Sequence, residues 1–248
     1  MTHVHPGCIL ITGSNGGLGS RLARSFLEAG FQNLACHYRS SSDAIAGLLR
    51  EHGLDPERHL FKAELTDEAA IRTMREEVTA HLGSVWGLVN LAGGSSNGMS
   101  WKLPLAEFTR VLNANLVSTF LMTREFLPGM REGGGGRIIN VSSVIAHTGI
   151  VGASHYCAAK AGIEGFTRAV AQEVAGKKIT VNCLALGYFD QGIIADVPKE
   201  LLDVVLGRVP VKRLGQASEL HPLVSYLLSE QAGFLTGQVL HLNGGLYS

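Results

Sequence analysis

A tyrosine and a lysine four residues apart are the side chains of this sequence best suited to move a proton. Tyr156 and Lys160 lie in a stretch that predicts a helix over residues 156–175, where this spacing puts both side chains on one face. A phenol titrates near pH 10, roughly, and we expect a neighbouring ammonium to lower that pKa. Such a tyrosine can serve as a general acid and base. By spacing alone, the pair also fits two ordinary side chains on a helix surface.

Ser143 is the third residue with a plausible place in this chemistry. It follows a predicted strand at residues 137–141, at the carboxyl edge of the sheet, where an open α/β fold binds ligands. Its hydroxyl is suited to bond a substrate oxygen on which negative charge develops. We expect the neighbouring His147 and His155 to line the pocket without reacting.

A glycine-rich segment near the start of the chain predicts a turn that binds phosphate. It reads TGSNGGLG from residue 12 to 19 and connects a predicted strand to a predicted helix. Glycines let the backbone turn tightly and approach a pyrophosphate, and the start of the helix offers free N–H groups. The expected dinucleotide contacts here are Gly13, Ser14, Asn15, Gly17, Leu18 and Gly19. An ordinary glycine turn is the alternative.

The end of the second predicted strand bears on the choice of dinucleotide. An acid about 20 residues past the glycines binds the ribose hydroxyls of NAD, whereas an arginine pairs with the 2′-phosphate of NADP. The segment after Tyr38 contains Arg39 and three serines, and no acid comes before Asp43. Arg39 therefore favours NADP(H) over NAD(H), although it also fits a solvated loop residue.

Short apolar runs alternate with helical stretches along the whole chain. Strands are predicted at residues 8–12, 33–38, 59–63, 87–90, 137–141, 180–184 and 239–242, and helices at 18–29, 43–52, 67–82, 105–130, 156–175 and 218–228. This order predicts an α/β fold of the Rossmann type, with a doubly wound, mainly parallel, seven-stranded sheet and helices on both faces. We expect a single domain over residues 1–248, in which a segment at about 188–211 covers the substrate.

The composition excludes several other classes. Lys plus Arg and Asp plus Glu number 21 each, so no global field draws in nucleic acid or an anionic membrane. No apolar run approaches the roughly 18 residues of a membrane span, and the N-terminus lacks signal-peptide features. The four cysteines show no metal-binding spacing. We expect a cytoplasmic protein that holds no metal.

The sequence resembles the short-chain dehydrogenases/reductases over nearly its full length. The resemblance rests on the glycine turn, Asn90-Leu91-Ala92-Gly93, Asn115, Ser143, Tyr156-x-x-x-Lys160, Thr236-Gly237-Gln238 and Asn243-Gly244-Gly245. It implies hydride transfer between a nicotinamide and a carbonyl or alcohol. It further implies that Tyr156 is the general acid/base, that Ser143 binds substrate, and that Lys160 binds the nicotinamide ribose and lowers the Tyr156 pKa. Asn115 would hold a water in the proton relay, with Asn113 as the competing choice.

The resemblance also assigns further dinucleotide contacts. They are Glu64, where the family usually has an Asp that meets adenine, and Leu65, Asn90, Leu91, Ala92, Gly93, Tyr156, Lys160, Gly187 and Phe189. Three further positions depart from the family pattern. Leu91 replaces an Asn, Leu186 replaces a Pro before Gly187, and Gln191 stands where a Thr often contacts the nicotinamide amide.

Within the family, the sequence is most similar to the 3-oxoacyl-[acyl-carrier-protein] reductase group. Residues 38–41, 136–143 and 156–162 carry this similarity. It implies NADPH-dependent reduction of a β-keto thioester in fatty acid synthesis, a substrate free or carried on acyl carrier protein, and a homotetramer. Two other functions stay open. One is a dehydrogenase of a sugar or secondary alcohol, and the other is a non-catalytic NADP(H)-binding regulator.

Overall fold

The sheet at the centre of the molecule has seven strands. The computed structural model describes residues 5–191 and 199–248, without the side chains of 199–203. The strands are β1 (Cys8–Ile11), β2 (Leu34–Tyr38), β3 (Leu60–Lys62), β4 (Val85–Asn90), β5 (Gly136–Ser143), β6 (Ile179–Leu186) and β7 (Val239–Leu242). Their order is β3-β2-β1-β4-β5-β6-β7, and every neighbouring pair is parallel. The predicted parallel seven-stranded sheet is confirmed.

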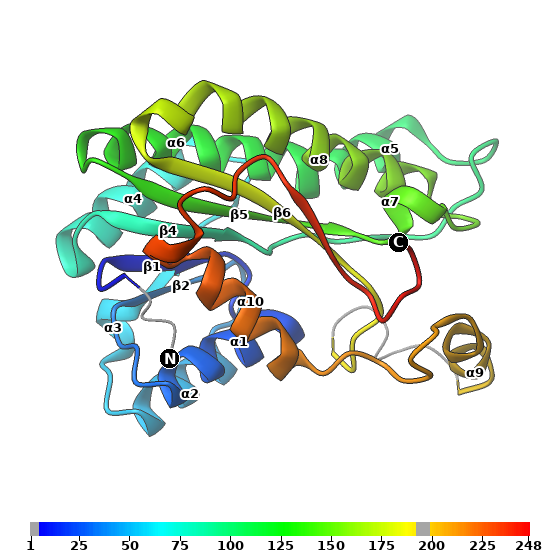
Figure 1. Cartoon of the computed structure of the whole chain (residues 1–248), viewed down its shortest axis with the longest axis horizontal. Coiled ribbons are helices and arrows are strands. Elements are labelled where there is room, and N and C mark those ends of the chain that lie inside the picture. Colours follow the sequence, from blue (N-terminus) through cyan, green and yellow to red (C-terminus); the bar gives the residue numbers. More distant parts are fainter. Residues whose placement is uncertain (1–4, 192–198) are drawn as a thin grey trace.

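Helices cover both faces of the sheet (Figure 1). On one face lie α4 (Glu68–Leu82), α5 (Leu105–Leu112), α6 (Ser118–Glu132) and α8 (Ser154–Val174), and on the other lie α1 (Gly17–Glu28), α2 (Asp43–Glu51) and α10 (Leu220–Leu227). The shorter helices are α3 (Pro56–His59), α7 (Ile145–Thr148) and α9 (Lys199–Arg208). This is the doubly wound arrangement that the alternation of strands and helices predicts.

The two helical layers enclose two hydrophobic cores. Successive residues of a strand point to opposite faces, so Leu10 of β1 packs in the core with α4, α6 and α8, whereas Ile9 and Ile11 pack in the core with α1, α2 and α10. All three side chains are completely buried. A central parallel strand is covered on both sides, which explains why its sequence is continuously apolar and not alternating.

The strand order brings the predicted site residues to one edge of the sheet. The chain runs outward in one direction through β1, β2 and β3 and returns to β4 on the other side of β1. The connections after β1 and β4 therefore diverge, which leaves a crevice at the carboxyl ends of the strands. The glycine turn follows β1 there, and Ser143 ends β5 beside β4.

The structure corrects the predicted helix at residues 105–130. It consists of α5, a π-helical turn at Asn113–Val117 and α6, which continues through Pro128 to Glu132. Pro128 lies inside α6 and does not end it, although proline commonly breaks a helix. It removes only its own N–H group, while Met130 beyond it is buried in the core, so packing carries the helix one turn further. Of the predicted substrate cover at 188–211, residues 192–198 lie outside the described residues.

Candidate active site

The glycine turn is tied to the strands around it by hydrogen bonds. Gly13 has a φ of +71°, a conformation that favours glycine. Before it, the Oγ1 of Thr12 accepts from the backbone N–H groups of Leu91 and Ala92, both at 2.9 Å. After it, the Oγ of Ser14 donates to the carbonyl of Ile11 at 2.7 Å. The turn and the end of β4 are therefore held as one unit.

The start of α1 packs so closely on this turn that it leaves no room for side chains. A Cβ at Gly19 would lie under 3.0 Å from the carbonyl oxygen of Gly13, a distance that real Cβ atoms essentially never show. Gly16 caps the helix without a side-chain hydrogen bond, so the first N–H groups stay open for an anion. Bare backbone beside an uncapped helix start fits the pyrophosphate of a dinucleotide, with Gly17 and Leu18 in the first turn of the helix.

Tyr156 and Lys160 lie in the first two turns of α8, which packs on β5. Both are buried, with 8% and 4% of their surface exposed, and the Nζ of Lys160 is 5.5 Å from the centre of the Tyr156 ring. The same Nζ donates to the carbonyl of Val141 at 2.8 Å, two residues before Ser143. The Lys160 ammonium therefore lies at the end of β5 that carries Ser143.

Burial changes the pKa values of both groups. It raises the pKa of Tyr156 to about 12 and lowers that of Lys160 to about 8. The predicted lowering of the tyrosine pKa is wrong for this arrangement, because desolvation of the tyrosinate is the larger effect and the ammonium donates to a backbone carbonyl instead. At neutral pH the phenol keeps its proton and the amine is largely charged. A protonated phenol is suited to give a proton away.

Asn115 lies in the π-helical turn and is completely buried. Its Nδ2 donates to the carbonyls of Gly94 at 2.7 Å and of Val111 at 2.8 Å. Its Oδ1 has no partner among the described residues, and it would lie 2.5 Å from a Cβ at Gly93, a position also near the Nζ of Lys160. A buried acceptor without a protein partner fits a bound water. The half-buried Asn113 of the same turn shows no such feature.

Two of the predicted adenine-side contacts, Arg39 and Glu64, are exposed at the ends of β2 and β3. Arg39 follows β2 and forms no ion pair with any described side chain, so its guanidinium is available to an anion. The Oε1 of Glu64 accepts from the N–H and hydroxyl of Thr66, at 3.3 and 3.0 Å. Leu65 is buried in the core, which leaves only its backbone for a ligand. Asn15 bonds the N–H of Ile45 at 3.2 Å.

Several predicted contacts stabilise the fold itself, a role that the sequence did not indicate. The side chain of Asn90 donates to Asn140 at 2.8 Å inside the protein. A Cβ at Gly187 would lie 2.6 Å from the Cα of Asn243, so this glycine is needed for packing. Leu186, in place of the family's proline, continues β6 in register with β5 and β7. Phe189 is buried and bridges to the backbone of Gly215.

A buried carboxylate that the sequence did not indicate lies behind Ser143. Glu164 is 4% exposed, and its Oε1 accepts from the Oγ of Ser142 at 2.8 Å and bonds the Nε2 of His147 at 2.9 Å. The carboxylate therefore bonds residues on either side of Ser143, and we call the segment from Ser142 to His147 the Ser143 turn. His147 stacks on Tyr247, with ring centres 4.6 Å apart, so it is partly covered by the C-terminal segment. A glutamate in a helix gives no signal of this role.

His155, expected to line the pocket, is buried instead. No part of its surface is exposed, and its Nε2 bonds the hydroxyl of Ser96 at 2.9 Å. It therefore fastens the loop after β4 to the start of α8, one residue before Tyr156. Its Nδ1 has no partner among the described residues.

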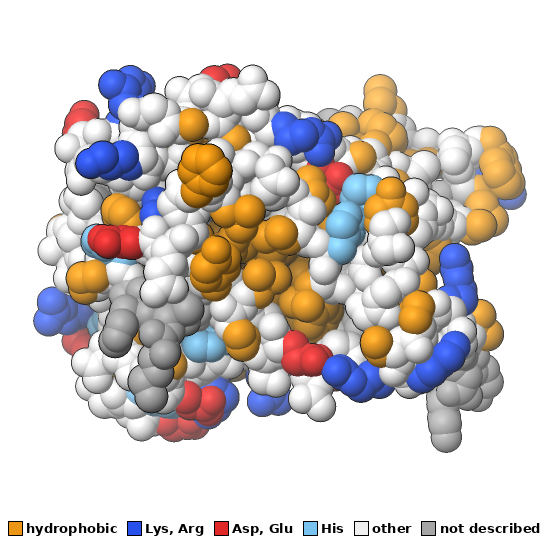
Figure 2. All heavy atoms as spheres, in the orientation of Figure 1, with side chains coloured by type: hydrophobic (Ala, Val, Ile, Leu, Met, Phe, Trp, Pro, Cys, Tyr) orange, Lys and Arg blue, Asp and Glu red, His pale blue; other side chains and the backbone are white. Residues whose placement is uncertain are grey.

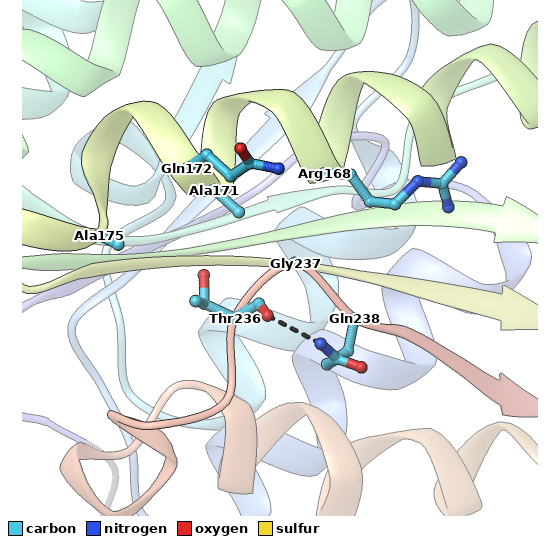
Figure 3. Close-up of a pocket in the computed structure, with 7 residues that line it drawn as sticks. All are labelled: Arg168, Ala171, Gln172, Ala175, Thr236, Gly237 and Gln238. Atoms are coloured by element: carbon cyan, nitrogen blue, oxygen red, sulfur yellow. Dashed lines mark hydrogen bonds between the residues drawn. The ribbon is translucent and has the colours of Figure 1, made fainter.

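One surface cavity lies well away from these residues. It has a volume of about 290 Å³ and lies between α8 and the segment leading to β7 (Figure 3). Arg168 and Gln172 line one wall, and Thr236 and Gln238 line the other, where the Gln238 amide donates to the Thr236 carbonyl at 3.0 Å. Arg168 is 12 residues, or about 18 Å along a helix, beyond Tyr156. This cavity is not the site of the proton chemistry.

Within the described residues, no His, Cys, Asp and Glu side chains gather as a metal site would require. In the same part of the chain, no helix combines the length and the apolar character needed to span a membrane.

Comparisons with known proteins give the family. A model described as short chain dehydrogenase matches residues 7–201. Nodulation protein G of Azospirillum brasilense is 37% identical over 237 residues, acetoacetyl-CoA reductase of Cupriavidus necator is 34% identical over 237, and 3-oxoacyl-[acyl-carrier-protein] reductase of Pseudomonas aeruginosa is 35% identical over 239. Each match covers 96% of this chain and 96% of the relative. The chain belongs to the short-chain dehydrogenase family of oxidoreductases, which bind a nicotinamide cofactor and act on CH–OH or C=O groups.

Proposed function

We propose that this protein is an NADPH-dependent reductase of ketones, with 3-oxoacyl thioesters as its substrate class. The observation that carries the proposal is the burial of the Tyr156 phenol beside Lys160, whose Nζ lies 5.5 Å from the centre of the tyrosine ring. A phenol is protonated at neutral pH, so it carries the proton that reduction of a carbonyl requires, and the alkoxide that forms on the substrate is basic enough to take it. Two of the relatives above are named as reductases of acetoacetyl-CoA and of 3-oxoacyl-[acyl-carrier-protein].

Each polar residue has a separate task in this reaction. The bound nicotinamide supplies the hydride. Ser143 donates a hydrogen bond to the carbonyl oxygen, which gains negative charge, and Tyr156 gives that oxygen its proton, so that the product is an alcohol. The Lys160 ammonium, 5.5 Å from the centre of the tyrosine ring, attracts the tyrosinate left behind, and this attraction is smaller than the effect of burial on the tyrosine pKa. Its pKa of about 8 lies close enough to neutral pH for it to exchange protons. Asn115 holds the water that returns a proton to this pair.

The proposed choice of NADP(H) over NAD(H) rests on the charges at the end of β2. Arg39 is exposed there, and the next acid, Asp43, already accepts from the hydroxyl of Ser41 at 3.1 Å. A phosphate on the ribose would therefore meet a guanidinium and serine hydroxyls and no free carboxylate of this segment.

An exposed apolar face supports the proposed assembly into a homotetramer. Hydrophobic side chains gather in the middle of the face shown in Figure 2, which Figure 1 shows to be crossed by β7 and α10. Tyr226 and Phe234 are among the exposed apolar side chains, and β7 is an edge strand with partly exposed apolar residues. Contiguous apolar surface of this kind is typical of a protein interface. The proposed cytoplasmic location follows from the composition and the spacing of the cysteines, and the proposed substrate carried on acyl carrier protein follows from the family resemblance.

A spectrophotometric assay tests the proposal. Purified protein is mixed with acetoacetyl-CoA and either NADPH or NADH, and the loss of the reduced nicotinamide absorbance is followed. We expect turnover that is faster with NADPH and that is lost in Tyr156→Phe. Oxidation of a sugar or secondary alcohol with NAD, without reduction of the thioester, would favour a dehydrogenase. Tight NADP(H) binding without activity on any carbonyl would favour a regulator.

A further inference from the structure

A histidine lies directly beside the glycine turn at the end of β2. His37 is 2% exposed. Its Nδ1 accepts from the backbone N–H of Gly13 at 3.0 Å, and its Nε2 bonds the carbonyl of Ala63 at 3.0 Å. Its own carbonyl accepts from the N–H of Ser14 at 2.9 Å. One residue therefore connects the glycine turn to the end of β3, the two segments assigned to the phosphates and to the adenine.

These contacts are compatible with only one protonation state of the ring. The Gly13 N–H is a donor, so the Nδ1 that faces it must carry no proton. The Ala63 carbonyl is an acceptor, so the Nε2 must carry one. The imidazole is therefore neutral. A second proton would fall on the Nδ1 and would point at the Gly13 N–H, which would break the hydrogen bond and push the turn away.

The surroundings keep this ring neutral near pH 7. Burial lowers the pKa of His37 below its usual 6.5. Two charged groups act on it more weakly: Glu64, on the segment after β3, raises the pKa, and Arg39, on the same strand end, lowers it. The ring therefore gains its second proton only in acid. In the protein without dinucleotide, the Gly13 N–H then loses the Nδ1 that accepts its hydrogen bond.

We propose that His37 is a positioning residue for the dinucleotide, whose neutral ring fixes the glycine turn and whose protonation releases the turn and weakens binding. This inference rests on the proposed function, in that the dinucleotide lies on the glycine turn. Because only the neutral form binds well, the Kd rises as the pH falls through the His37 pKa, and it approaches a tenfold rise per pH unit below that pKa.

The first test measures the Kd of NADH between pH 8 and pH 5. NADH is the probe because it lacks the 2′-phosphate, which itself titrates near pH 6, roughly. In the variant His37→Asn, the amide oxygen can accept from Gly13 at every pH. We expect the Kd of wild type to rise in acid and the Kd of His37→Asn to stay nearly flat. The same pH profile in both proteins would overturn the inference.

A matched control comes from a second buried histidine. His59 bonds the carbonyl of Leu34 at 2.8 Å, at the start of β2 and far along that strand from the glycine turn. The variant His59→Asn removes a buried imidazole without touching the turn, so it should keep the pH profile of wild type. If the Kd of His59→Asn also stayed flat with pH, the flat profile of His37→Asn would reflect a general loss of structure, and the inference would fail.

A second measurement uses only the wild-type protein, so its result does not depend on whether a variant folds. By linkage, a ligand that prefers the neutral ring must lower the pKa of His37 when it binds. NMR titration of the imidazole with and without NADH should show this fall, and an unchanged pKa would overturn the inference. If wild type bound neither NADH nor NADPH at pH 8, the proposed function would fail instead.

Discussion

Replacing Lys160 by methionine should make the protein more stable while it abolishes the proton chemistry. The ammonium is buried on α8, and the Val141 carbonyl is the hydrogen-bond acceptor the structure gives it. Charged groups are costly to bury, and a buried charge kept for function is a common source of lost stability. Methionine has nearly the same length and shape and carries no charge, so it fills the space with little change in packing.

The size of the effect follows from the pKa. A fall in the Lys160 pKa from 10.5 to about 8 corresponds to about 3 kcal/mol of preference for the neutral amine, at about 1.4 kcal/mol for each pH unit. Losing the hydrogen bond to Val141 offsets about 1–2 kcal/mol of this. We therefore expect the free energy of unfolding of Lys160→Met to exceed that of wild type by about 1–2 kcal/mol at pH 7.

The difference should also depend on pH with a definite sign. Between pH 8 and pH 10.5 the unfolded chain keeps the lysine proton while the folded protein has lost it, so wild-type stability rises with pH across this window. The variant has no such group. Its advantage over wild type should therefore be full at pH 7 and should shrink as the pH rises through this window.

Urea unfolding of both proteins at pH 7, 8.5 and 10 measures this difference. The slopes with urea should agree, so that the midpoints can be compared directly. A variant that is less stable than wild type at pH 7, by an amount that does not change with pH, would refute the reasoning that the ammonium is desolvated in the folded protein.

Three further substitutions test other parts of the site. Gly19→Ala should raise the Kd of NADPH at least about tenfold, because its Cβ collides with the Gly13 carbonyl. The control Gly47→Ala, whose Cβ meets nothing within 4 Å, should leave the Kd unchanged. Equal Kd values for the two variants in calorimetry would contradict this prediction. Arg39→Ala should weaken NADPH about ten- to a hundredfold and NADH hardly at all, and an equal loss for both would remove the 2′-phosphate assignment. Glu164→Leu should lower kcat by about tenfold or more at an unchanged NADPH Kd, because Ser142 and His147 lose their shared acceptor. The control Glu164→Gln keeps an acceptor oxygen and should lower kcat less. A rise in the NADPH Kd instead of a fall in kcat would mean that the carboxylate does not act on the Ser143 turn.

The sheet and its helical layers could be predicted because they depend on local patterns. Continuous apolar runs such as Cys8–Ile11 are buried on both faces, and a glycine turn such as the one at Gly13 follows from backbone conformations that glycine favours. The end of α6 could not be predicted. Pro128 is a local signal for a helix end, but burial of Met130, a tertiary contact, carries the helix past it.

The chemistry of the site was less accessible, because it depends on contacts between distant segments. The spacing of Tyr156 and Lys160 indicates that they share a helix face, but the direction of the tyrosine pKa depends on burial and on the Val141 carbonyl, which the sequence does not reveal. In the same way, the bonds of His37 to Gly13 and of Glu164 to Ser142 join residues that are 24 and 22 positions apart.

The most direct test of the central claim is a single-turnover measurement on Tyr156→Phe. Protein in excess over NADPH is mixed with acetoacetyl-CoA, and the oxidation of the bound nucleotide is followed, with the Kd of NADPH determined separately. We expect the Kd to stay within about twofold of wild type and the rate of oxidation to fall by at least about a hundredfold, as loss of a general acid requires. A variant that oxidises NADPH at the wild-type rate would contradict the assignment of the proton to this phenol.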